Sequence, residues 1–127
     1  MRGAPKSPVL VVDDYATMAE DVRNLLFHMG FEAVDVAADG RQAYAMAATG
    51  RYGLVISDWD MHPMTGLELL QQMRENPVLT TTPVIIISAD ATPERSAAAV
   101  QAGAAAFLSK PFTADHLRTV VATALAR

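Results

Sequence analysis

Carboxylates follow two apolar runs of the sequence, each at the point where the run ends. Asp58 closes the run 54–57, and Asp13 and Asp14 close the run 8–12. Short apolar runs rich in β-branched residues are typical of strands that are buried on both faces of a parallel sheet. Ligands of open α/β sheets bind beside the carboxyl ends of such strands. We therefore expect the three carboxylates to converge at one edge of a sheet.

Three converging carboxylates would repel one another and raise each other's pKa values. They stay ionised only if a cation with a preference for oxygen ligands lies among them, and Mg²⁺ fits this description best. Asp13, Asp14 and Asp58 are therefore candidate Mg²⁺ ligands.

The remaining chain supplies the elements that would position these acids. Apolar runs predict five strands, at 8–12, 33–36, 54–58, 84–88 and 106–108. Helical patterns separate them, with Asp39 and Thr113 as N-caps, Pro93 in a first turn, and Gly30, Gly50 and Gly103 as terminators. The second helix is expected at about 41–49. Regular alternation of strand and helix predicts an α/β fold, a doubly wound parallel sheet with helices on both faces.

Further polar residues follow the fourth and fifth predicted strands. Ser88 ends the fourth, and Lys110-Pro111 follows the fifth. With Asp13-Asp14 and Asp58, this pattern resembles the receiver domain of two-component response regulators, at the length of the single-domain, CheY-like type. The resemblance covers residues 8–127 and implies the flavodoxin-like strand order 2-1-3-4-5 that is known for CheY.

The resemblance implies a function for each of these residues. Asp58 would accept a phosphoryl group from a phosphohistidine of a histidine kinase or a histidine phosphotransfer protein. Mg²⁺ would be held by Asp14 and Asp58, by Asp13 directly or through water, and by the backbone carbonyl of Asp60. Lys110 would neutralise phosphoryl charge, because phosphoryl transfer depends mainly on positioning and electrostatics. Such a protein is not an enzyme in the usual sense, although it promotes its own phosphorylation and dephosphorylation.

The resemblance also implies a switch. The Ser88 hydroxyl would turn toward the phosphoryl group, the Phe107 ring would fill the vacated space, and the surface of the fourth helix, fifth strand and fifth helix would change. The family generally has a cis bond before the proline at position 111. Asp60 and Asp90 stand where the family sets phosphoryl lifetime, and the sign of their effect is open.

Two further positions are notable. His62 stands where the family commonly has proline, and Pro63 follows one residue later, so the loop beside the metal is expected to differ. Helical spacing places Phe27 opposite the apolar side of the first helix. We expect it to lie beside the active-site end of that helix and to contact the partner kinase.

Composition limits the other functions. A chain of 127 residues with a net charge of −4 and no basic tract is consistent with one domain that does not bind nucleic acid. There is no cysteine, as is compatible with a cytoplasmic protein, and no apolar run of membrane-spanning length. We expect a disordered tail at 1–7 and a receiver domain at 8–127. Few charges are available for pairing across a dimer, which favours a monomer.

Two alternative functions are compatible with part of the pattern. Asp58-Trp59-Asp60 has the Asp-x-Asp spacing of haloacid-dehalogenase-like phosphatases, but that class usually has the motif on its first strand, a further acidic motif and a longer chain. A pseudo-receiver that docks without accepting phosphate typically lacks one of the acids or the lysine, and all of them are present here.

Overall fold

Strands and helices alternate five times along the chain. The structure is a computed structural model that describes residues 7–126, so nearly all of the predicted N-terminal tail lies outside the described residues. The strands are β1 (Val9–Val12), β2 (Val34–Ala37), β3 (Leu54–Asp58), β4 (Val84–Ser88) and β5 (Ala106–Ser109). The helices are α1 (Ala16–His28), α2 (Gly40–Ala47), α3 (Gly66–Glu75), α4 (Pro93–Gln101) and α5 (Ala114–Leu125).

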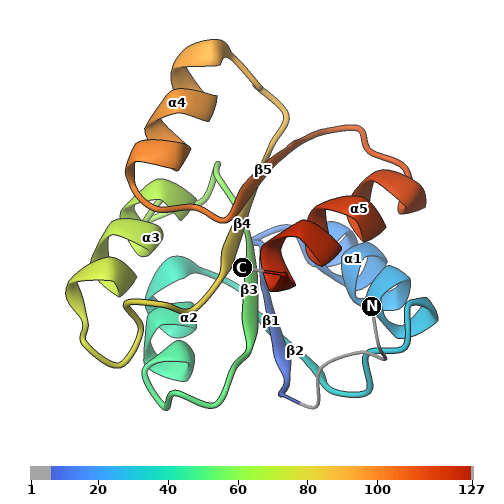
Figure 1. The fold of residues 1–127 in the computed structure, drawn as a ribbon, viewed down its shortest axis with the longest axis horizontal. Helices are drawn as coiled ribbons and strands as arrows, with labels where there is room; N and C mark the ends of the chain where they lie inside the picture. Colours follow the sequence, from blue (N-terminus) through green and yellow to red (C-terminus); the bar gives the residue numbers. More distant parts are fainter. Residues whose placement is uncertain (1–6, 127) are drawn as a thin grey trace.

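The strands form one parallel sheet in the order β2-β1-β3-β4-β5, which confirms the predicted fold class and topology (Figure 1). β3 lies at the centre, with Ser57 paired to Val12 of β1 and Asp58 paired to Ile87 of β4. The carboxyl ends of β1, β3 and β4 therefore lie side by side. No helix within residues 7–126 is long and apolar enough to cross a membrane.

Helices cover both faces of the sheet, as Figure 1 shows, with α1 and α5 on one side and α2, α3 and α4 on the other. Alternate residues of each strand point to opposite faces. In β1, Val9 and Val11 pack under α1 and α5, whereas Leu10 and Val12 pack under the other helices. Both faces of the strand are therefore buried, and this is why the strands are continuous apolar runs.

Helix boundaries follow their capping residues. Asp39 and Thr113 accept hydrogen bonds from the first turns of α2 and α5, as predicted. Thr65 and Glu68 form a reciprocal capping box at the start of α3. Several predicted boundaries differ by one or two residues. β2 begins and ends one residue later than 33–36, α2 covers Gly40–Ala47 rather than about 41–49, β1 begins at Val9, and β5 ends at Ser109.

Gly66 permits a close approach between α3 and the end of β3. Its backbone N–H donates to the carbonyl of Trp59 at 2.9 Å. A Cβ at this position would overlap the backbone carbonyl oxygen of Asp58 and lie 3.1 Å from Ser57 Oγ. Only glycine therefore fits without moving the backbone that carries Asp58.

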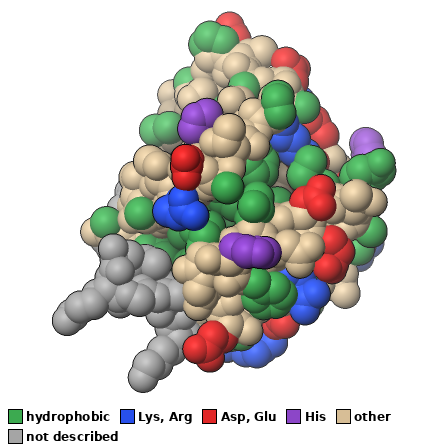
Figure 2. Space-filling view, turned by 90° about the vertical axis from the view of Figure 1, so that its right-hand side faces the viewer, with side chains coloured by type: hydrophobic (Ala, Val, Ile, Leu, Met, Phe, Trp, Pro, Cys, Tyr) green, Lys and Arg blue, Asp and Glu red, His purple; other side chains and the backbone are tan. Residues whose placement is uncertain are grey.

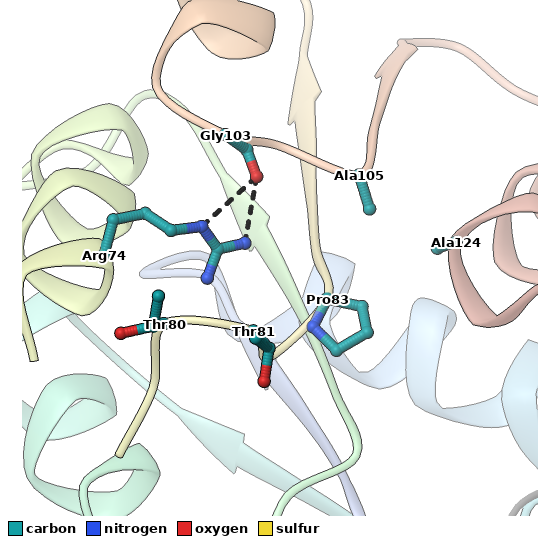
Figure 3. Close-up of a pocket in the computed structure, with 7 residues that line it drawn as sticks. All are labelled: Arg74, Thr80, Thr81, Pro83, Gly103, Ala105 and Ala124. Atoms are coloured by element: carbon teal, nitrogen blue, oxygen red, sulfur yellow. Dashed lines mark hydrogen bonds between the residues drawn. The ribbon is translucent and has the colours of Figure 1, made fainter. Parts of the chain in front are cut away.

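A pocket lies at the amino ends of the strands, opposite the carboxyl ends that carry the acids. Pro83 precedes β4 there, and Ala105 precedes β5 (Figure 3). Arg74 reaches across it from α3 and donates hydrogen bonds to the carbonyl of Gly103, from Nε at 3.3 Å and from Nη2 at 2.9 Å. Its Nη1 donates to the carbonyl of Leu79 at 2.9 Å. The guanidinium therefore joins the loops that precede β4 and β5.

Candidate functional site

Three carboxylates converge at the carboxyl edge of the sheet. Asp13 and Asp14 follow β1, Asp58 ends β3, and one carboxylate oxygen of each lies within 4.8 Å of the others. Asp13 and Asp58 are buried, whereas Asp14 is exposed. The Oδ1 atom of Asp13 also accepts a hydrogen bond from the backbone N–H of Tyr15 at 2.9 Å. The pairing of β1 with β3 thus produces the predicted cluster.

Lys110 brings a positive charge to this cluster. Its Nζ lies 2.9 Å from Asp58 Oδ1 and 4.0 Å from Asp13 Oδ2. The backbone N–H of Lys110 donates to the carbonyl of Ser88 at 2.9 Å, which fixes the residue beside the end of β4. The Lys110–Pro111 peptide bond is cis, as the resemblance to receiver domains implied.

Burial raises the pKa of the Asp58 carboxyl above its usual value, and the charges of Asp60 and Asp14 act in the same direction against the lowering effect of Lys110. Burial likewise raises the pKa of Asp13, although its hydrogen bond from Tyr15 opposes this. Both shifts reflect carboxylates that are held close together out of water.

The acid cluster fits a divalent cation. Asp58 Oδ1 is enclosed and, although it is ion-paired with Lys110, it makes no hydrogen bond of good geometry among the described residues. An oxygen left in this state is a ready ligand, and it lies among two other carboxylates. Hard cations such as Mg²⁺ take oxygen ligands of this kind. The residues present are therefore suited to the predicted metal.

Arg95 forms a second cationic contact that sequence reasoning missed. Its guanidinium donates to both carboxylate oxygens of Asp60 at 3.1 Å and, from Nη1, to Ser88 Oγ at 2.9 Å. It also lies 4.6 Å from the centroid of the Trp59 ring. A usable signal was present in the sequence. Arg95 is the third residue of a helix capped by Thr92, a position where glutamate is favoured and a cation opposes the helix dipole.

The predicted switch residues lie beside these groups. Ser88 is fully buried, and its Oγ accepts a second hydrogen bond, from the backbone N–H of Asp90 at 3.1 Å. Phe107 is half-buried on β5, and its ring meets Trp59 edge to face, with 6.4 Å between ring centroids. Ser88 and Phe107 are thus linked through Arg95 and Trp59.

The carboxylate of Asp60 is paired with Arg95. The side chain of Asp90 is exposed, and its backbone N–H donates to Ser88 Oγ at the site. His62 is exposed in the following loop, and the His62–Pro63 bond is cis.

The expected position of Phe27 was wrong in one respect. The side chain is 38% exposed, as helical spacing indicated, but it lies in the last turn of α1. α1 runs antiparallel to the strands, so this turn lies at the sheet edge opposite Asp58. Arg23 lies 5.0 Å from the centroid of the Phe27 ring and donates to the carbonyl of Val34 at the start of β2. Phe27 is therefore remote from the acid cluster.

Charges are mixed on the face shown in Figure 2, where acidic, basic and hydrophobic side chains are interspersed. No large area of positive charge is visible on this face, in keeping with the net charge of −4.

Comparison with known proteins agrees with the geometry. A family model for the response regulator receiver domain matches residues 9–122. This chain belongs to that family. The receiver domain is 40% identical over 110 residues to chemotaxis protein CheY-3 of Vibrio cholerae serotype O1, covering 87% of this chain and 85% of the relative. It is 37% identical over 110 residues to chemotaxis protein CheY of Pseudomonas aeruginosa, covering 87% and 89%.

Solved structures show the same fold. The receiver domain matches chemotaxis protein CheY4 of Vibrio cholerae with a TM-score of 0.87 and 32% identity, covering 95% of this chain and all of the other. A putative response regulator from Chloroflexus aurantiacus matches with a TM-score of 0.90 and 29% identity, covering 97% and 100%. The chain is therefore a CheY-like receiver domain of two-component signalling.

Proposed function

We propose that Asp58 is the phosphoacceptor of this receiver domain and takes its phosphoryl group from a phosphohistidine on a histidine kinase or phosphotransfer protein. An Asp58 oxygen forms the new bond to phosphorus while the bond from phosphorus to the histidine nitrogen breaks. The nitrogen leaves with the bonding electron pair. The observation that carries the proposal is the buried Asp58 oxygen that lies among two acids and Lys110 and has no hydrogen bond of good geometry from residues 7–126.

The surrounding residues supply the charge that this transfer needs. Lys110 Nζ lies where it can pair with a phosphoryl oxygen on Asp58. Asp13, Asp14, Asp58 and the backbone carbonyl of Asp60 would hold Mg²⁺. When bound, the ion neutralises carboxylate and phosphoryl charge. The protein is then a phosphoacceptor that also promotes loss of its own phosphoryl group, and not an enzyme with a separate substrate.

An apolar groove beside Lys110 supports docking of such a phosphodonor. It lies between α1 and the segment that follows β5, and it is lined by Met18, Asp21, Leu25, Ala89, Lys110, Pro111 and Phe112. We propose that the phosphodonor binds at this groove. We further propose that this protein is cytoplasmic and acts as a monomer. A separate downstream protein would read the surface of α4, β5 and α5 after Ser88 and Phe107 rearrange.

The phosphatase alternative is disfavoured by Asp60. A general acid two residues after the nucleophile must deliver its proton to the leaving group, whereas both oxygens of Asp60 accept hydrogen bonds from Arg95. The pseudo-receiver alternative is disfavoured because the acids and the lysine meet at one site.

Acetyl phosphate with Mg²⁺ provides the test. We expect the protein to gain the mass of one phosphoryl group, bound as a hydroxylamine-labile acyl phosphate. Asp58→Asn should gain none, and Asp115→Asn, which changes an exposed carboxylate on α5, should behave as wild type. Modification of Asp58→Asn to the wild-type level would contradict the proposal.

The metal assignment has its own readout. Trp59 is the only tryptophan and directly follows Asp58. Mg²⁺ should change its emission and raise the melting temperature, with a stabilisation of about 1.4 kcal/mol when the free ion is at tenfold its Kd. An unchanged emission and an unchanged melting temperature across a Mg²⁺ titration would remove Mg²⁺ from the proposal.

A further inference from the structure

Arg95 connects the first turn of α4 to three groups at the acceptor site. It contacts the carboxylate of Asp60, the hydroxyl of Ser88 and the face of the Trp59 ring. Its side chain is 24% exposed, so these contacts are partly shielded from water. A planar guanidinium can make all of them at once, whereas an ammonium group cannot offer the same fork of donors.

The bond from Arg95 to Ser88 opposes the switch. Ser88 Oγ accepts from both Arg95 and the backbone N–H of Asp90, which occupies the two acceptor positions of the hydroxyl. If Ser88 turns to donate to a phosphoryl oxygen on Asp58, its oxygen moves away from Arg95. The hydroxyl proton is free to donate in the resting arrangement, so it is this displacement of the oxygen that would exchange the bond from Arg95 for the bond to the phosphoryl group.

α4 buries only small side chains against the rest of the domain. Ala99 is its only fully buried residue, whereas α3 buries two leucines and a methionine. A single buried methyl group contributes little to packing. The contacts of Arg95 consequently make up a large part of the attachment of this first turn to the sheet.

We propose that Arg95 is a positioning residue that holds α4 and Ser88 in the resting arrangement and releases Ser88 when Asp58 is phosphorylated. The inference rests on the proposed function, because it assumes a phosphoryl group at Asp58. It assigns to Arg95 the link between that group and the movement of α4. The contacts to Asp60 and Trp59 keep the guanidinium at the site after Ser88 leaves.

The test measures binding of beryllofluoride, a phosphoryl mimic, in the presence of Mg²⁺. Arg95→Met keeps the long stem against Trp59 and removes the donors. In wild type, the hydrogen bond from Arg95 to Ser88 must break when beryllofluoride binds, and the variant lacks this bond. The variant should therefore bind beryllofluoride about tenfold more tightly than wild type. Amide NMR resonances of α4 in the free variant should lie part of the way toward their beryllofluoride-bound positions.

Two controls separate this effect from a general loss of stability. Arg118→Met removes an exposed arginine of α5 whose side chain pairs with Asp115 on the same helix, and it should bind as wild type. In a Ser88→Ala background, Arg95→Met should change the affinity by less than about twofold, because the bond that it removes is already absent. If Arg95→Met does not fold, Arg95→Lys retains the charge without the fork and should show the same direction of change.

The possible results test the role of Arg95 separately from the phosphoacceptor function of Asp58. If wild type binds beryllofluoride and Arg95→Met binds equally well, the inference is wrong and the phosphoacceptor function stands. If Arg95→Met binds more weakly, Arg95 is a phosphoryl contact rather than a restraint on Ser88, which also overturns the inference. If wild type does not bind beryllofluoride at all, both proposals fail.

Discussion

Lys110 and Arg95 both bring positive charge to the carboxyl edge of the sheet, yet they contact different groups. Lys110 follows β5 and pairs with Asp58 and, at longer range, Asp13. Arg95 belongs to α4 and pairs with Asp60, Ser88 and Trp59. The lysine thus touches the acids proposed for chemistry, and the arginine touches the residues around them.

The chemistry of the two side chains matches this division. An ammonium group on a flexible stem is a compact charge that can follow a phosphoryl oxygen as it arrives. A guanidinium is a rigid fork that holds several partners in one arrangement. We infer that charge for phosphoryl transfer and restraint on the switch have been assigned to separate residues at this site.

The largest expected effect is on the rate of phosphorylation. Lys110→Met should slow modification of Asp58 by acetyl phosphate at least about 100-fold, as is typical when one charge-stabilising donor is removed from a reacting site. Arg95→Met should change this rate less than about tenfold. Mass spectrometry at timed intervals measures both. Equal losses in the two variants would show that the cations share one role.

Gly66→Ala tests the backbone segment that carries the partners of both cations. Gly66 bonds to the carbonyl of Trp59, which lies between Asp58, the partner of Lys110, and Asp60, the partner of Arg95. The new Cβ would overlap the Asp58 carbonyl, and overpacking of this kind costs about 1–3 kcal/mol of unfolding free energy. Urea unfolding measures the loss. Gly40→Ala is a milder comparison, since its Cβ would lie 2.9 Å from Cβ and Sδ of the Met64 side chain instead of overlapping a backbone carbonyl, and it should cost less than Gly66→Ala. An unchanged stability in Gly66→Ala would show that the end of β3 can move freely.

The buried acids around Lys110 should make stability depend on pH in the acidic range. Because burial raises the pKa of Asp58, the stability that this group contributes is full below its ordinary value of 3.8 and is lost as pH rises through the raised value. Without metal at pH 7, Asp58→Asn should therefore be more stable than wild type, by about 1.4 kcal/mol for each unit of the shift. The difference should vanish below pH 3.8. Urea unfolding midpoints of the two proteins in EDTA measure this difference in stability. An Asp58→Asn protein that is less stable than wild type at pH 7 would contradict the prediction.

The smallest effect is expected for Phe27→Ala, at the sheet edge that neither Lys110 nor Arg95 reaches. Its ring is partly exposed beneath Arg23, so truncation should cost well below the roughly 3 kcal/mol of a buried phenylalanine. Phosphorylation of Asp58, from acetyl phosphate or from a partner kinase, should be unchanged. A slower reaction with the kinase alone would show that the partner reaches this distant edge.

Local patterns predicted the strands and the acid cluster well. The run 84–88 is apolar because β4 is covered on both faces, and this is a direct consequence of a central position in a parallel sheet. Asp39 and Thr113 were predicted as caps because capping depends on the residues that follow immediately. Asp13, Asp14 and Asp58 were placed together because strand ends in one parallel sheet meet at one edge.

Contacts between separate elements were harder to predict. Arg95 and Asp60 are 35 positions apart, and only the packing of α4 beside the segment after β3 brings them together. Phe27 was placed on the correct side of its helix but at the wrong end, because helical periodicity gives the direction around an axis and not the position along it. The one-residue shift of β2 arose at an edge strand, where the hydrophobic pattern is weaker.

The sparse packing of α4 has a consequence for cooperativity. Because Ala99 is its only fully buried residue, we expect this helix to open locally while the buried leucines of α3 and α5 remain in place. Local opening of this kind costs much less than global unfolding, and it defines a low-stability unit within a stable domain. We therefore expect the surface that includes α4 to rearrange without unfolding of the rest of the domain.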